Sequence, residues 1–161
     1  MTDSNTPATA TRPMTTTKID FVSDVSCPWC AIGLQSLLAA LKNLGSTGAD
    51  LHFQPFELNP DMVPGGEDIA AHIRRKYCAS PQQFAQSQEM IRARGAELGF
   101  RFDMEKRTRI YNTFDAHRLL HWAGLEGKQL ELKQALLNAY FAATGKRIRS
   151  VPLRDQNITF A

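Results

Sequence analysis

Long apolar runs are missing from this sequence. No uninterrupted apolar run among its 161 residues exceeds five residues, whereas a helix that crosses a bilayer needs about 20. The N-terminus also lacks the apolar core of about 7–15 residues that a secretory signal requires. Cysteine is scarce as well, with three residues in the whole chain. We therefore expect a cytoplasmic protein without membrane contact, in which the thiols stay reduced and no disulfide framework supports the fold.

An excess of charge of one sign is absent too. The 19 basic and 16 acidic residues leave a net charge of +3 and a pI of about 8.9. Nucleic-acid binding usually needs basic residues concentrated on one face, whereas here they are spread among acidic neighbours. We expect no nucleic-acid partner. The length and the 43% of hydrophobic residues are typical of one globular domain.

The chain divides into four segments. Residues 1–17 hold seven threonines and no large apolar residue except methionine, which predicts a disordered tail, with Met14 as an alternative start. Residues 18–60 predict a strand, a helix ended by Gly45 and a second strand at 51–54, which together form a parallel βαβ unit. Residues 61–145 form the third segment, in which residues 67–140 have helical periodicity without a convincing strand and predict helices over 67–77, 81–98, 113–122 and 126–143. Residues 146–161 continue neither pattern.

The strongest chemical signal is the motif CPWC at residues 27–30. Pro28 suits the first position of a helix, which makes Cys27 the N-cap residue and places Cys30 one turn further on. Both sulfurs then lie within reach of a disulfide. Unpaired N–H groups and the positive end of the helix dipole favour the thiolate of Cys27, so we expect its pKa to be lowered. Cys30, less exposed, is suited to resolve a mixed disulfide formed at Cys27.

Two other interpretations of this motif remain open. The cysteines could pack as small hydrophobic side chains, or they could form half of a zinc site. The sequence has no second CxxC, and the two histidines with helical spacing, His117 and His121, lack the glutamate of a zinc protease motif. We therefore expect no metal, and the strand–CxxC–helix context favours redox chemistry.

Three motifs in order resemble a known family. They are SDVSCPWC at 23–30, PFELNP at 55–60 and NTFDAHRL at 112–119. Over residues 18–141 the chain resembles the FrnE branch of the DsbA-like thioredoxin family, which is related to the 2-hydroxychromene-2-carboxylate isomerases and the kappa-class glutathione transferases. The resemblance implies an α/β, thioredoxin-like fold interrupted by an all-helical domain over 61–145.

The resemblance also implies a function and a set of site residues. Cys27 and Cys30 are the expected catalytic pair of a thiol–disulfide oxidoreductase, and Pro28 and Trp29 tune its reactivity. The candidate substrate-binding residues are Asp24, Ser26, Asn112 and Thr113. We expect no bound cofactor, with glutathione or a protein dithiol as redox partner and a protein or small-molecule thiol or disulfide as substrate. The alternative is a glutathione-dependent isomerase or transferase, but those relatives characteristically have serine near the position of Cys27.

The C-terminal segment departs from the family pattern. A thioredoxin fold needs a cis-proline loop, a hairpin and a final helix after the helical domain, about 30 residues in all. Only 16 residues follow Gly145, and the pair Val151-Pro152 is not followed by the apolar run of a core strand. We therefore expect an aberrant or truncated end over 146–161 and an impaired exchange activity, with a non-catalytic remnant as the extreme case.

Overall fold

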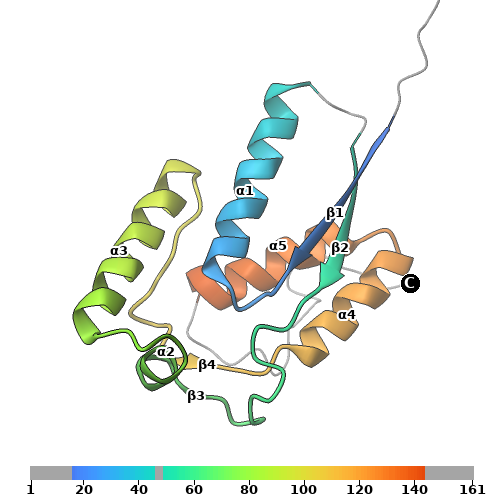
Figure 1. Ribbon diagram of the computed structural model, residues 1–161. Coiled ribbons are helices and arrows are strands. Elements are labelled where there is room, and N and C mark those ends of the chain that lie inside the picture. The colour runs from blue at the N-terminus through green and yellow to red at the C-terminus, as the bar shows by residue number, and fades with distance from the viewer. Residues whose placement is uncertain (1–15, 46–48, 144–161) are drawn as a thin grey trace, which may run out of the picture.

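The computed structural model describes residues 16–45 and 49–143. Most of the tail expected over 1–17 and the whole segment 146–161 lie outside these residues. Figure 1 shows α1 beside two strands, α2 and α3 on the other side of α1, and α4 and α5 together below. The elements in chain order are β1 (Thr17–Ser23), α1 (Pro28–Asn43), β2 (Ala49–Pro55), β3 (Glu67–Asp68), α2 (Ile69–Tyr77), α3 (Pro81–Glu97), β4 (Arg109–Ile110), α4 (Phe114–Leu125), α5 (Gln129–Asn138) and a π-helical turn (Ala139–Ala143).

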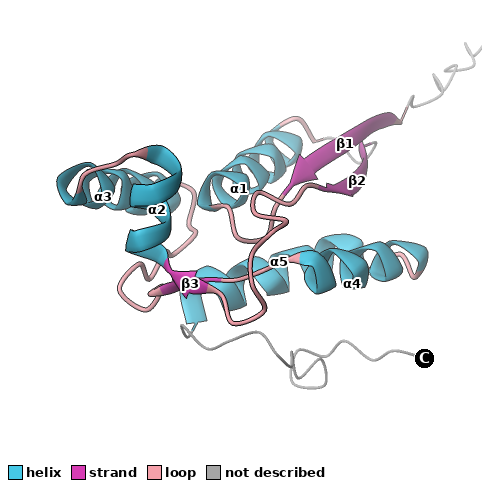
Figure 2. Cartoon of the chain, turned by 60° about the horizontal axis from the view of Figure 1, so that its bottom comes forward, coloured by secondary structure: helices cyan, strands magenta, loops and turns pink. Residues whose placement is uncertain are grey.

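The N-terminal segment forms the expected parallel unit. Strands β1 and β2 run parallel, with Ile19 opposite Leu51 and Phe21 opposite Phe53. The two phenylalanine rings meet edge to face with their centroids 5.8 Å apart, a geometry that aromatic pairs prefer. Helix α1 connects the strands, and Figure 2 shows α4 and α5 running below both α1 and the strands. The predicted βαβ arrangement is confirmed.

One hydrophobic core joins the first segment to the helical one. Ala31 and Leu34 of α1 are fully buried, as is Leu137 of α5. They share a cluster with Phe53 of β2 and Phe141. Each buried leucine or phenylalanine contributes about 1.5–3 kcal/mol relative to an exposed one. The end of β1 and the N-terminus of α1 are therefore held by packing against helices that come much later in the chain.

The expectation that residues 67–140 contain no strand is wrong. Glu67 and Asp68 pair with Ile110 and Arg109 in a short antiparallel bridge. Gly66 makes this approach possible, because a Cβ atom there would lie 2.2 Å from the carbonyl oxygen of Ile110. A bridge with two residues on each strand is too short to show an alternating pattern, so the sequence gives no sign of it. Helix α2 consequently begins at Ile69, two residues later than expected.

Two other helix boundaries differ from expectation. Helix α4 passes through Gly124 and ends at Leu125, because the residue with a left-handed backbone is Gly127, at φ 67°. Helix α5 begins at Gln129 rather than Glu126 and gives way after Asn138 to the π-helical turn. Propensity alone does not distinguish two nearby glycines, whereas only one of them takes the conformation that ends a helix.

Helices α2 and α3 begin at well-defined caps. Ser80 and Gln83 form the expected capping box. The N–H of Gln83 donates to Ser80 Oγ at 3.2 Å, and the N–H of Ser80 donates to Gln83 Oε1 at 2.8 Å. Asp68 caps α2 by accepting from Ala71 N–H at 2.8 Å. Each such cap stabilises a helix by about 1 kcal/mol.

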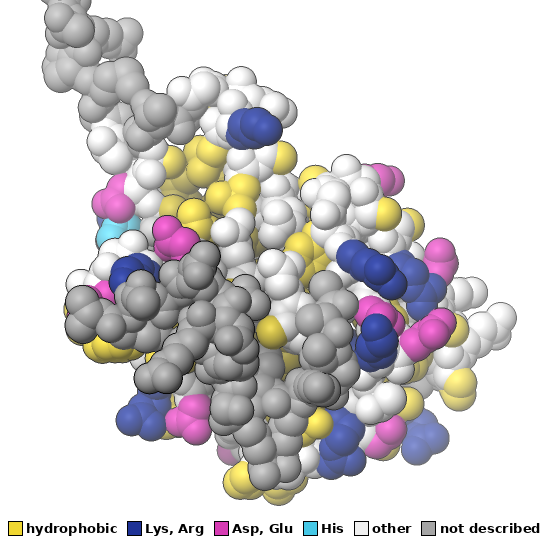
Figure 3. Space-filling view, turned by 180° about the vertical axis from the view of Figure 1, so that it is seen from behind, with side chains coloured by type: hydrophobic (Ala, Val, Ile, Leu, Met, Phe, Trp, Pro, Cys, Tyr) yellow, Lys and Arg dark blue, Asp and Glu magenta, His cyan; other side chains and the backbone are white. Residues whose placement is uncertain are grey.

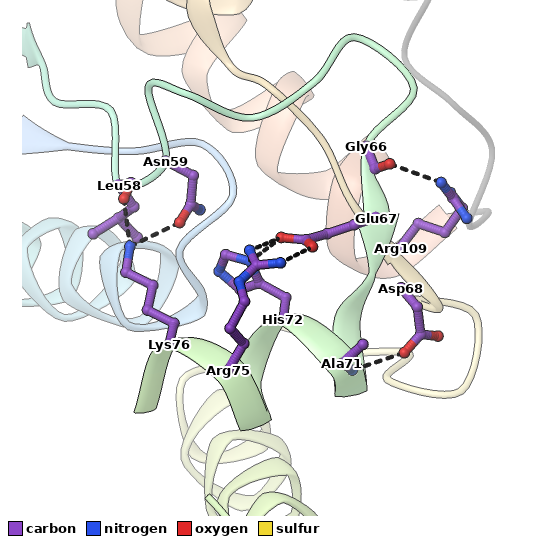
Figure 4. A network of polar contacts seen from close by, with 10 residues as sticks. All are labelled: Leu58, Asn59, Gly66, Glu67, Asp68, Ala71, His72, Arg75, Lys76 and Arg109. Carbon is purple, nitrogen blue, oxygen red and sulfur yellow. Dashed lines mark hydrogen bonds and ion pairs between the residues drawn. The ribbon is translucent and has the colours of Figure 1, made fainter. Parts of the chain in front are cut away.

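A polar network ties α2 to its surroundings, as Figure 4 shows. Glu67 contacts the buried His72 and accepts two hydrogen bonds from the guanidinium of Arg75, at 2.6 and 2.7 Å. On the next turn, Lys76 donates to the carbonyl oxygen of Leu58 at 2.5 Å and to the side chain of Asn59 at 2.7 Å. The network therefore fixes the loop that follows β2 onto α2.

The charged residues are mixed on the surface. On the face shown in Figure 3, Lys and Arg side chains are interspersed with Asp and Glu rather than gathered into one patch. Within residues 16–45 and 49–143, no helix has the length and apolar character to cross a membrane.

Cys78 provides a test of the backbone at the end of α2. This exposed residue has φ 54° and ψ 25°, a left-handed conformation that costs residues other than glycine about 1–2 kcal/mol. Glycine loses more chain entropy on folding, about 0.5–1 kcal/mol. Cys78→Gly should therefore raise the free energy of unfolding by about 0.5–1 kcal/mol, as measured by urea titration of the reduced protein. Cys78→Ala removes the thiol but keeps the strain, so equal stability of the two variants would contradict this account.

Candidate functional site

The two cysteines of the CPWC motif lie at the N-terminus of α1. Cys27 is the N-cap residue in an extended conformation, and Pro28 occupies the first helical position, where its missing N–H costs nothing. The N–H groups of Cys30 and Ala31 donate to the carbonyl oxygen of Cys27 at 3.1 and 3.2 Å. This first turn brings the sulfurs of Cys27 and Cys30 together, as the sequence predicts.

The two thiols have very different acidities. A hydrogen bond from the Cys30 thiol contributes most to lowering the pKa of Cys27, which falls to about 6 despite partial burial. The backbone N–H groups of Cys30 and Trp29 add to this effect, although neither makes a regular capping bond with the sulfur. The same contact with Cys27, together with burial, strongly raises the pKa of Cys30. At neutral pH the pair therefore consists of one thiolate and one thiol.

Asp24 is the buried centre of the loop before the motif. Its side chain is inaccessible to solvent, and its carboxylate accepts from Ser26 N–H at 3.0 Å and from Leu58 N–H at 2.7 Å. The Nε2 atom of His117 lies 3.6 Å from the same carboxylate. Burial alone would raise the pKa of Asp24, but the nearby His117 side chain, the hydrogen bonds from Ser26 and Leu58 and the Thr113 side chain lower it. Asp24 therefore remains charged, and it joins β1, the loop after β2 and α4.

The structure brings most of the expected site residues together. Ser26 and Thr113 are buried beside Asp24, where they face the protein interior rather than solvent. Trp29 is 46% exposed, on the outside of the motif. Asn112 does not join the group, because its side chain donates to Pro60 O at 3.2 Å and accepts from Phe114 N–H at 2.9 Å. A role of these residues in substrate binding stays a prediction.

Two cations near the motif come from the helical segment, and the sequence analysis missed both. Arg107 donates to the carbonyl oxygen of Ser26 at 2.9 Å, and its guanidinium lies 5.5 and 5.2 Å from the ring centroids of Tyr140 and Phe141. No sequence signal links Arg107 to a residue 81 positions earlier. Lys133 is only 1% exposed. Its spacing of four residues from the buried Leu137 could have placed it on the apolar face of its helix.

The buried side-chain atoms without a hydrogen-bond partner, within the part of the chain that the structure describes, are Ser23 Oγ, Ser26 Oγ, Arg107 Nε, His117 Nε2 and Tyr140 OH. His117, one of the two histidines with helical spacing, faces Asp24. Among the described residues no group of three or more His, Cys, Asp or Glu side chains is arranged to hold a metal ion.

Comparison with known proteins places this site in a family context. The family model of the DSBA-like thioredoxin domain matches residues 18–153. A solved structure of a probable DsbA oxidoreductase from Streptomyces coelicolor is similar, with a TM-score of 0.74 and 27% sequence identity. The match covers 81% of this chain and 56% of that protein's chain. No curated protein matches the sequence significantly. The expected thioredoxin-like fold is confirmed.

The lowered pKa of Cys27 predicts its reactivity with pH. Iodoacetamide reacts with thiolates, so alkylation of Cys27 should reach half of its maximal rate near pH 6 and remain much faster than alkylation of Cys30 at pH 7. Peptide mapping by mass spectrometry measures both rates. In Cys30→Ala the largest stabilising hydrogen bond is lost, and the midpoint for Cys27 should move to higher pH. An unchanged midpoint would show that Cys30 does not stabilise the thiolate.

The burial of Asp24 predicts a stability effect. Asp24→Asn keeps the shape of the side chain but leaves one buried N–H without its charged acceptor, so the free energy of unfolding should fall by about 1–3 kcal/mol at pH 7. Because the folded state lowers the pKa of Asp24, its contribution is present above about pH 4 and lost as pH falls through the folded pKa. Chemical denaturation across this range measures it.

A matched control for this change is available on β1, the strand that leads to the loop with Asp24. Asp20→Asn alters an exposed aspartate whose hydrogen bond to Gln54 is at the surface, so it should change stability by less than about 1 kcal/mol. Equal effects of the two substitutions would contradict the central position of Asp24.

Proposed function

Because the chain belongs to the DsbA-like thioredoxin family, we propose that it catalyses thiol–disulfide exchange through Cys27 and Cys30. The observation that supports this proposal is the unequal pair of thiols at one helix N-terminus. Cys27, with its pKa of about 6, is ionised at neutral pH and attacks a disulfide, whereas Cys30 keeps its proton until it is needed.

The proposed reaction has two steps. The thiolate of Cys27 attacks one sulfur of a substrate disulfide, forms a mixed disulfide and releases the other sulfur as a thiolate. Cys30 then loses its proton and attacks the sulfur of Cys27, which releases the second substrate thiol and leaves a Cys27–Cys30 disulfide. The reverse sequence oxidises a substrate dithiol. Pro28 and the exposed Trp29 adjoin the reacting sulfur and are proposed to tune its reactivity.

The redox partner is proposed from the same chemistry. Glutathione or a protein dithiol restores the pair by exchange, so the reaction needs no bound cofactor. The substrate is a protein or small molecule that carries an accessible disulfide or thiol pair. We propose a cytoplasmic location and an FrnE-like role rather than an isomerase role, since cysteine stands at position 27, where the isomerase relatives characteristically have serine.

Three single variants test the function with glutathione disulfide as substrate. Cys27→Ser should lower the rate of exchange at least 100-fold, because a serine hydroxyl is not ionised at neutral pH. Cys30→Ser should stop turnover and accumulate a mixed disulfide at Cys27, visible as the added mass of one glutathione. Cys78→Ser is the matched control, since this thiol is exposed and remote from the motif in the sequence, and it should keep the full rate.

The outcomes separate the competing functions. An isomerase or transferase would keep glutathione-dependent activity in Cys27→Ser, and a non-catalytic chain would show no exchange above that of free thiols. Loss of exchange in Cys78→Ser equal to that in Cys27→Ser would overturn the assignment of the pair.

A further inference from the structure

Lys133 is a buried cation that the proposed chemistry has not yet used. The side chain is 1% exposed and is the largest of those fully buried within the described residues. Lysine is almost never fully buried without a compensating charge, because removal of its ammonium from water is costly. A leucine or methionine at this place in α5 would avoid that cost.

The neighbours of Lys133 on α5 show where its side chain is held. Leu132 and Leu136 pack with Val25, in the loop that leads to Cys27. Leu137 belongs to the cluster that contains Ala31 of α1. Lys133 is flanked on α5 by these leucines, which pack against Val25 of the loop and against the cluster of α1. Its Nζ atom lies 5.8 Å from the centroid of the Phe53 ring, a favourable position for a cation.

The charges that act on Lys133 belong to the thiol site. Burial lowers the pKa of Lys133 to about 8, and negative charge on Cys30, Asp24 and Cys27 opposes that shift, with Cys30 first. At pH 7 the ammonium therefore persists in most molecules. The influence is mutual, because the charge of Lys133 lowers the pKa of the Cys30 thiol.

A cation near Cys30 favours the resolving step, because it stabilises the thiolate that must attack. Once Cys27 is joined to substrate, it no longer carries the negative charge that opposes ionisation of Cys30. Burial still opposes ionisation of Cys30, whereas the backbone N–H of Asp24 and the charge of Lys133 favour it. The nearby His117 on α4 faces Asp24 rather than the cysteines, and Phe53 on β2 is uncharged. Lys133 is thus placed to favour a thiolate at Cys30.

We propose that Lys133 is a positioning residue for the second step of exchange, in which its ammonium stabilises the thiolate of Cys30 while that sulfur attacks the mixed disulfide at Cys27. This inference rests on the proposed exchange function. The Cys30 proton passes to solvent, the new Cys27–Cys30 bond forms, and the bond from Cys27 to the substrate sulfur breaks. The departing thiolate then takes up a proton, so the step needs no oxidant or reductant beyond the substrate disulfide.

The two steps can be observed separately with 5,5′-dithiobis(2-nitrobenzoic acid). A reduced chain carrying Cys78→Ser should release one thionitrobenzoate when Cys27 reacts and a second when Cys30 resolves the mixed disulfide. Excess reagent makes the first release fast, and stopped-flow absorbance follows the second. Lys133→Met removes the charge and keeps the apolar stem. Lys42→Met, in the exposed last turn of α1, is the matched control.

The expected effect follows from thiol chemistry. A rise of one unit in the pKa of Cys30 lowers its thiolate fraction tenfold, while the greater nucleophilicity of the weaker acid recovers about threefold. Lys133→Met should therefore slow the second release about threefold or more at pH 7, with a much smaller change in the first release. The difference from the parent should shrink above about pH 8, where Lys133 itself loses its proton. Lys42→Met should change neither release.

Each result decides between the alternatives. An unchanged second release in Lys133→Met, an equal slowing of both releases, or a slowing that persists at pH 9 would overturn the role of Lys133. If Lys133→Met does not fold, Lys133→Gln makes the same comparison. Failure of the parent to release the second thionitrobenzoate would instead overturn the exchange function itself, so the two proposals fail in different ways.

Discussion

The buried carboxylate of Asp24 is the constraint on which the site depends. Its charge is sustained by hydrogen bonds from Ser26 and Leu58 and by its contact with His117. Those groups come from three separate parts of the chain, and each must be in place for the charge to be tolerated without water. The loop before Cys27 is consequently held at a fixed position against β2 and α4. From the other side, Lys76 of α2 fixes the carbonyl oxygen of Leu58.

The helical segment is part of the thiol site as well as a cover for the strands. It supplies Arg107, which holds the carbonyl oxygen of Ser26, and Lys133, whose charge acts on Cys30. It also supplies Leu137 and Phe141, which pack with α1 and β2. The βαβ unit alone has two strands and would leave Asp24 without its partner on α4. The same contacts that complete the core therefore set the charges around the sulfurs.

The family match and the local geometry support the function in different ways. A thioredoxin-like fold carries many activities, so the fold by itself does not choose among them. The choice of exchange chemistry rests on the thiolate at Cys27 beside a protonated Cys30, which is a property of these residues at this helix end. The structural match covers 56% of the Streptomyces coelicolor protein, and the family model spans the whole thiol site of this chain.

The sequence by itself determined the features that depend on near neighbours. The CPWC motif at a helix N-terminus, the parallel βαβ unit and the capping box at Ser80 all follow from spacing and from the preferences of single residues, and the structure has them. The β3–β4 bridge, the contact of His117 with Asp24 and the placement of Arg107 and Lys133 were decided by tertiary structure. In each case the partners are separated by tens of residues. A buried charge or a two-residue bridge also produces no periodic pattern of apolar and polar residues in the sequence. Such contacts form only because the packed core brings distant segments together and excludes water from the charges between them.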